Sequence, residues 1–249
     1  MTKHTCCAVS SACLLLCSFH AHSQTADTLT KQSGVSLSIE TQQQDYDLTS
    51  LSFDQPALAP LATMKARINA SSDIKATSIK LNHWVNPHIN LFGVISKVTG
   101  EGTATLPALP GLNLPDVRIN ADGTTYSIGA TAVAKRGKHF GAATYVYTAY
   151  QPDNMNTTND SWSLTPAVGT ITPIGIFSLG LRYQQSKGNY IGTTTTPLGE
   201  VNANIGVKNK DHNSWIIDYR TPLTDSLLFS TSAELGNRQG VRLELTQRF

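Results

Sequence analysis

The nine residues Val241 to Phe249 read V-R-L-E-L-T-Q-R-F, and this stretch decides the fold. Val241, Leu243, Leu245 and Phe249 alternate with charged or polar residues. Because successive side chains of an extended strand point to opposite faces, the segment has one apolar face and one hydrophilic face. The pattern predicts a β-strand that lies between an apolar environment and an aqueous one.

The same alternation recurs along the chain. Ten amphipathic segments can be marked, at about 34–48, 74–85, 88–98, 124–135, 139–151, 161–171, 176–187, 213–221, 226–235 and 241–249. Short connections rich in Pro, Gly and Asn follow every second segment, at 86–87, 136–138, 172–175 and 222–225. Longer connections lie at 49–73, 99–123, 152–160 and 188–212. The chain therefore alternates tight turns with long loops.

This layout, with its final Phe249, resembles the outer-membrane β-barrels of Gram-negative bacteria, whose closing strand typically ends in a Phe that the barrel-insertion machinery reads. The hairpin Leu81 to Gly93 also resembles a W-V-x-P-x-x-N-x-[FY]-G hairpin of uncharacterised proteobacterial outer-membrane barrels. The resemblance implies an all-β fold, a transmembrane antiparallel up-and-down barrel of about ten strands, in the cell outer membrane. It also implies that the outward residues of the last strand form a carboxyl-terminal assembly signal: Val241, Leu243, Leu245 and Phe249. Eight or twelve strands stay open, because the first segment and residues 198–210 are ambiguous.

The amino end has the features of a secretory signal peptide over 1–23. Lys3 precedes a short apolar stretch at 12–17, and Ala21-His22-Ser23 is a small-x-small cleavage pattern. A lipoprotein with Cys17 at the cleavage point is an alternative that the bulky Leu16 disfavours. We expect a short segment over 24–33 and the barrel over 34–249.

Composition narrows the class of protein. All four cysteines precede residue 18, so the expected mature chain has no disulfide. Loss of Lys3 with the leader lowers the formal charge from +2 to +1, which gives no basis for binding nucleic acid. No run of 18 apolar residues exists for a transmembrane helix. A soluble β-sandwich is the main alternative fold.

Aromatic residues are expected to form two girdles at the membrane interfaces, where amphipathic rings are favoured. The predicted girdle residues are Trp84, Tyr126, Phe140, Tyr150, Trp162, Phe177, Tyr183, Trp215 and Phe249.

Charged residues on the opposite face of the last segments are expected to point into the lumen. They are Arg182, Asp218, Arg220, Glu234, Arg242 and Glu244. Three charges of each sign on neighbouring strands predict a paired network that largely fills the lumen, because an unpaired charge in a narrow lumen is costly. A solvated pore wall is the alternative.

No motif predicts catalysis, a metal site or a cofactor. The pair Asp211-His212 invites comparison with the ten-stranded omptin proteases, but a matching acidic pair is missing. We expect a binding or envelope-structural barrel that is not an enzyme, with adhesion possible through the loops 49–73, 99–123 and 188–212. A narrow pore for small solutes is the alternative, and an outer-membrane hydrolase ranks third. The expected partners are outer-membrane lipid and lipopolysaccharide, the barrel-assembly machinery, and an external ligand or host surface.

Overall fold

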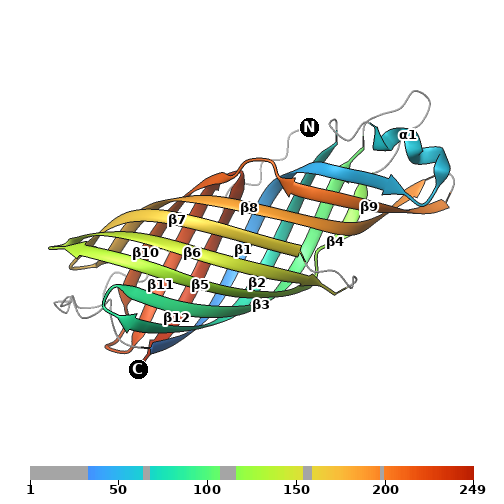
Figure 1. Ribbon diagram of the computed structural model, residues 1–249. Helices are drawn as coiled ribbons and strands as arrows, with labels where there is room; N and C mark the ends of the chain where they lie inside the picture. Colours follow the sequence, from blue (N-terminus) through green and yellow to red (C-terminus); the bar gives the residue numbers. More distant parts are fainter. Residues whose placement is uncertain (1–32, 64–67, 107–115, 154–158, 197–198) are drawn as a thin grey trace, which may run out of the picture.

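The computed structural model describes residues 33–63, 68–106, 116–153, 159–196 and 199–249 (Figure 1). Within these ranges, twelve strands form one closed antiparallel sheet. They are β1 (Ser33–Phe53), β2 (Asn69–Asn86), β3 (Ile89–Thr105), β4 (Val117–Asn120), β5 (Gly123–Arg136), β6 (His139–Pro152), β7 (Asn159–Thr172), β8 (Gly175–Thr196), β9 (Gly199–Asn209), β10 (Asn213–Pro222), β11 (Leu227–Gly236) and β12 (Arg238–Arg248). Two short helical turns, η2 (Pro56–Leu58) and α1 (Ala59–Ala62), follow β1.

Ten strands make the main barrel. Around its ring the order is β1, β2, β3, β5, β6, β7, β8, β10, β11 and β12, and β12 pairs back onto β1 from Gly34↔Arg248 to Gln44↔Arg238. Tight turns join β2 to β3, β5 to β6, β7 to β8 and β10 to β11 at one end, which we call the inner end. The carboxyl terminus lies at this end, opposite α1 (Figure 1). The prediction of a ten-stranded antiparallel barrel is confirmed.

The outer surface of this ten-stranded barrel is apolar. Leucine, isoleucine and valine side chains with exposed fractions from 40% to 68% cover it: Leu37, Ile39, Ile79, Leu81, Leu91, Ile95, Ile128, Leu164, Val168, Leu179, Ile217, Val241, Leu243 and Leu245. The inward positions between them are polar, as with Ser36, Ser38 and Gln42. Lipid is the environment in which such an exterior is stable, and a closed barrel satisfies its backbone there. The protein is therefore an outer-membrane β-barrel.

No helix within the described ranges is long and apolar enough to cross a membrane.

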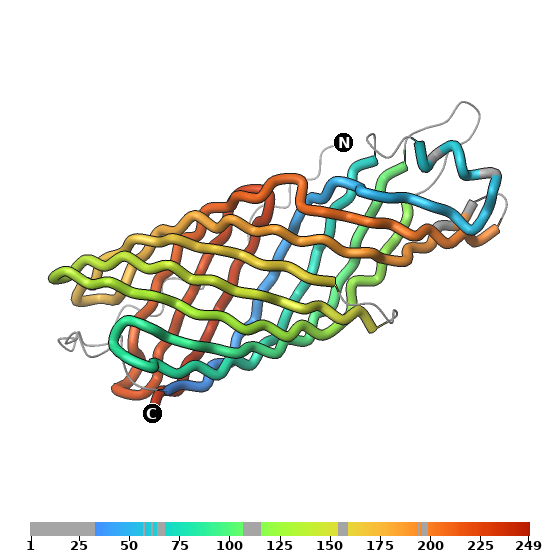
Figure 2. The backbone as a smooth tube through the Cα atoms, viewed as in Figure 1, coloured from blue at the N-terminus to red at the C-terminus, as the bar shows by residue number. Residues whose placement is uncertain are grey.

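Four strands continue past the ten-stranded barrel and, together with β4 and β9, close a second, narrower ring, which we call the outer extension. Its order is β1, β2, β3, β4, β8 and β9, and β9 pairs back onto β1 from Tyr46↔Asn209 to Phe53↔Ala203. Figure 2 shows β8 and β9 running on beside β1 toward the end that carries α1. The strands β1, β2, β3 and β8 thus belong to both rings.

The polarity pattern inverts where one ring passes into the other. In the first half of β1, Leu37 and Ile39 point outward and are 55% exposed. In its second half, Leu48 and Leu51 point inward and are buried, while Ser50 and Ser52 are exposed. An outside that is polar and an inside that is apolar is the arrangement of a water-soluble barrel. The outer extension therefore projects from the membrane into water.

This inversion corrects three of the predicted loops. The ranges 49–73, 99–123 and 188–212 hold much of the strands of the outer extension. Residues 201–209, V-N-A-N-I-G-V-K-N, alternate as regularly as the membrane strands, but with the apolar residues inside. The predicted segments were marked by their apolar outward faces. They therefore end where the outward face becomes polar, short of the true ends of the strands.

Asparagine side chains bridge the two junctions between the rings, where β1 and β8 each exchange one neighbouring strand for another. Beside β1, where β12 gives way to β9, Asn237 Nδ2 donates to the carbonyl oxygens of Asp45 and Asp211, both at 3.2 Å. Beside β8, where β7 gives way to β4, the backbone N–H of Asn189 donates to Asn159 Oδ1 at 3.0 Å. These amides replace strand pairing that is interrupted at each junction.

Candidate functional site: the lumen and its closed outer end

Charged side chains from five strands meet inside the ten-stranded barrel and form what we call the luminal charge network. Its ion pairs are Arg182–Glu234 (2.6 Å), Arg238–Glu234 (3.2 Å), Arg238–Glu40 (2.6 Å), Arg242–Glu40 (2.5 Å) and Lys80–Glu244 (2.6 Å). Ser214 Oγ also donates to Glu234 Oε1. Buried charges are tolerated when they are paired in this way. The network ties β1, β2, β8, β11 and β12 together across the lumen.

Four of the six residues predicted for such a network belong to these pairs: Arg182, Glu234, Arg242 and Glu244. Asp218 instead accepts a hydrogen bond of 3.3 Å from Ser178 Oγ, and Arg220 lies on the same inward face of β10. The sequence reasoning missed Glu40, Lys80 and Arg238. Strand alternation could have found both Glu40 and Lys80. Lys80 lies between the outward residues Ile79 and Leu81, and Glu40 comes directly after the outward Ile39, on the opposite face of the strand.

The space between the paired side chains of the network is small. A cavity of about 10 Å³ lies against Glu40, Arg182, Glu234 and Arg242. Such a volume is close to the least that can hold one water molecule. Side chains therefore narrow the lumen at this level, while Arg242 stays 40% exposed.

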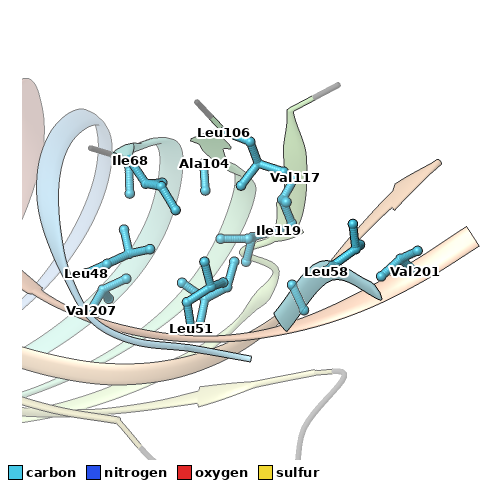
Figure 3. Close-up of a cluster of buried hydrophobic side chains, with 13 residues drawn as sticks. Leu48, Leu51, Leu58, Ile68, Ala104, Leu106, Val117, Ile119, Val201 and Val207 are labelled. Carbon is cyan, nitrogen blue, oxygen red and sulfur yellow. The ribbon is translucent and has the colours of Figure 1, made fainter. Parts of the chain in front are cut away.

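A packed apolar core closes the outer extension. It consists of Leu48, Leu51, Leu58, Ile68, Ala70, Ala104, Leu106, Val117, Ile119, Val201, Ala203, Ile205 and Val207 (Figure 3). Val117, Val201 and Ile205 are completely buried. Leu58 comes from η2, so the segment after β1 contributes to the core. Interiors of this kind pack to the density of organic crystals and exclude water.

A cavity of about 180 Å³ lies between the network and this core. Arg238 and Gln184 line it on the network side, and Ile119 and Val207 on the core side. The rings of Tyr150 and Tyr190, with centroids 6.3 Å apart, also line it. Burial raises the pKa of the Tyr190 phenol.

The outer aromatic girdle is continuous on one side of the barrel. Tyr145 stacks on Trp162 with centroids 6.4 Å apart, Trp162 meets Tyr183 at 5.4 Å, and Tyr183 meets His212 at 5.3 Å. Tyr126 and Trp215 face outward at the same end of their strands, and Phe177 faces outward near the inner turns. This placement suits the lipid–water boundary.

Three predicted girdle residues instead lie on the inward face. Phe140 packs over Gly169 of β7 and Tyr150 packs over Gly123 of β5, where a glycine leaves room for the ring. Trp84 shares the inward face of β2 with Lys80. On β6, the even-numbered positions of Phe140 and Tyr150 face inward. The odd-numbered positions face outward, and Tyr145 and Tyr147 occupy them. The residues proposed as a carboxyl-terminal assembly signal, Val241, Leu243, Leu245 and Phe249, all face outward.

The pair Asp211-His212 has structural contacts. His212 Nδ1 lies 2.9 Å from the carbonyl oxygen of Gln184, and Asp211 Oδ1 accepts from the backbone N–H of Asn213 at 3.1 Å. Both contacts hold the connection between β9 and β10. In the described ranges no three His, Cys, Asp or Glu side chains are grouped so as to hold a metal ion.

Comparison with known proteins gives similarity of fold only. No family model and no curated protein matches the chain. Among solved structures, an outer membrane channel from Pseudomonas putida F1 is 10% identical to this chain, with a TM-score of 0.40. The match covers 92% of this chain and 100% of the channel. The outer membrane protein OprG from Pseudomonas aeruginosa is 9% identical, with coverages of 89% and 98% and a TM-score of 0.40. The translocator domain of the autotransporter NalP from Neisseria meningitidis is 13% identical, with coverages of 87% and 88% and a TM-score of 0.40.

Proposed function

We propose that this outer-membrane barrel is a binding or envelope-structural protein that acts through its outer extension and is not an open diffusion pore. The single observation that carries the proposal is the packed apolar core inside the extension. A solute crossing from outside along the barrel axis would have to displace fully buried side chains such as Val201 and Ile205. The luminal charge network is a second barrier on the same path.

The outer extension suits a binding role because it is a rigid, strand-built surface outside the lipid. Its exterior carries serine, threonine, asparagine and aspartate side chains, including Asp47 and Ser52 on β1 and Asn202 and Asn204 on β9. Polar side chains on a rigid scaffold can hydrogen-bond an external ligand or host surface. Lipopolysaccharide beside the outer girdle and the barrel-assembly machinery at the closing strand are the other partners in this proposal. Neither Asp211 nor His212 has a catalytic role in it.

A narrow pore for small solutes is the second candidate. The polar lumen wall below the network, with Ser36, Ser38 and Ser78, and the cavity above it are the observations in its favour. In this alternative the network and the core would have to rearrange to let solutes pass.

Planar-bilayer recording of the purified full chain separates the two. We expect no stepwise conductance in 1 M KCl, from the wild type or from Glu234→Gln, because the outer core remains closed in both. Regular conductance steps from the wild type would overturn the proposal and favour the pore. In parallel, binding of the wild type to whole cells or lipopolysaccharide should fall when Asn202 and Asn204 are both replaced by Ala, and unchanged binding would count against the extension as the contact surface.

A further inference from the structure

We propose that the cavity between the luminal charge network and the outer core binds an uncharged single-ring molecule that carries one hydrogen-bond acceptor. The cavity is a different site from the exterior of the outer extension. Its occupancy therefore stands or falls independently of the proposed surface role.

The size of the cavity limits the ligand. An engineered cavity of about 150 Å³ in another protein accommodates benzene, so about 180 Å³ accommodates one ring with a small substituent. The lining suits a ring as well. Tyr46, Tyr150 and Tyr190 present aromatic surface, and Val98 and Ile74 add aliphatic surface. Rings pack favourably against tyrosine at offset or tilted geometry.

An unpartnered donor sets the acceptor requirement. Gln44 lines the cavity and is only 4% exposed. Its Oε1 accepts a hydrogen bond of 3.1 Å from Gln42 Nε2, but its own Nε2 has no partner among the described residues. Leaving a buried N–H group without an acceptor costs free energy. A ligand carbonyl or ether oxygen beside Gln44 would satisfy it.

The charge balance of the wall favours a neutral ligand. Arg238 is the cation on the network side of the cavity, and it already pairs with Glu40 at 2.6 Å and with Glu234 at 3.2 Å. An anionic ligand would have to compete with two carboxylates that are already in place. A neutral acceptor has to displace neither.

The cavity reaches the surface beside the outer girdle. Asp160 and Lys187 both line it and are exposed. On the side of β8 that faces β7 and β4, strand pairing ends at Lys187 and resumes at Gly192. This interruption lies beyond Trp162 and Tyr183 of the girdle, and the buried side chain of Asn159, which is hydrogen-bonded to the backbone of Asn189, fills it. A small molecule that enters here has to displace the side chain of Asn159, but it does not have to cross the outer core.

The test uses the full chain purified from outer membranes in detergent and three probes of similar shape. Acetophenone carries a neutral acceptor, ethylbenzene lacks one, and benzoate carries a charge. Binding is measured by titration with saturation-transfer NMR. We expect acetophenone to bind more tightly than either of the other two.

Two variants and one matched control assign the site. Gln44→Leu, which keeps the size of the side chain, should weaken acetophenone binding roughly three- to tenfold and leave ethylbenzene unchanged. Thr125→Phe places a ring inside the cavity, because Thr125 lines it, and should abolish binding of both probes. Thr124→Phe places the same ring on the outward face and should change neither. Heat-dependent gel mobility checks that each variant is folded.

Preference for ethylbenzene or benzoate over acetophenone would overturn the proposal. So would an unchanged acetophenone affinity in Gln44→Leu, binding that survives in folded Thr125→Phe, or no binding of any probe to the wild type. In the last case the cavity holds water only.

Discussion

Replacing Glu40 by Gln tests the luminal charge network most severely, because Glu40 joins two arginines. Its carboxylate accepts from Arg238 Nη2 at 2.6 Å and from Arg242 Nε and Nη2 at 2.8 and 2.5 Å. The glutamate side chain is 14% exposed and that of Arg238 is 16% exposed. The amide of Gln keeps the shape but turns an N–H group toward a guanidinium and removes the negative charge.

The expected loss of stability follows from these contacts. Removing one partner of a buried ion pair costs roughly 3–5 kcal/mol, since the other charge stays buried without compensation. Arg242 is 40% exposed and can regain some hydration, and Arg238 keeps Glu234. We therefore expect Glu40→Gln to lower the free energy of unfolding by about 3 kcal/mol, near the lower end of that range.

Urea unfolding in lipid vesicles, followed by tryptophan fluorescence and gel mobility, measures this change. Lys97→Met is the matched control, because Lys97 pairs with Asp153 at the same distance of 2.6 Å but both side chains are about half exposed. The control should lose at most about 1 kcal/mol. If Glu40→Gln costs no more than Lys97→Met, the network does not brace the barrel and the reasoning fails.

Three further substitutions give separate readouts. Gly169→Ala places a Cβ against the Phe140 ring and the Phe177 carbonyl oxygen, and it should lower the free energy of unfolding in urea by about 1–3 kcal/mol. The control Gly141→Ala, whose Cβ meets open space, should leave the free energy of unfolding unchanged. Ile205→Ala should cost about 2–5 kcal/mol in the outer core and increase protease cleavage of the extension on intact cells; resistance equal to the wild type would contradict a packed core. Asn237→Ala should speed amide exchange at Asp45 in NMR or mass spectrometry, and an unchanged rate would show that the bridge is dispensable.

The membrane part of the fold could be predicted from sequence because its alternation is visible residue by residue. Val241, Leu243 and Leu245 repeat the pattern that Leu37 and Ile39 begin, and tight turns rich in Pro and Gly separate the strands. The outer extension was not predicted, because the same two-residue period there places the apolar side chains inside and the polar side chains outside. An apolar residue such as Leu48 or Val201 faces inward only because the surrounding solvent has changed from lipid to water.

The lumen was only partly predictable for a different reason. Pairing between Glu40 and Arg242 depends on β12 closing against β1, and that contact joins residues about two hundred positions apart. Arg238 lies in a connection that the segment boundaries excluded. The inward position of Phe140 depends on Gly169 across the strand pair, a contact that no pattern within a single strand contains.

Cysteine labelling on intact cells tests the inverted outer extension most directly, since no cysteine follows Cys17. Single replacements at Asn202, Ala203, Asn204 and Ile205 sample alternate faces of β9. A membrane-impermeant maleimide should label the cysteines at 202 and 204 and spare those at 203 and 205. Equal labelling of all four, or of none, would contradict an external barrel with a packed apolar interior.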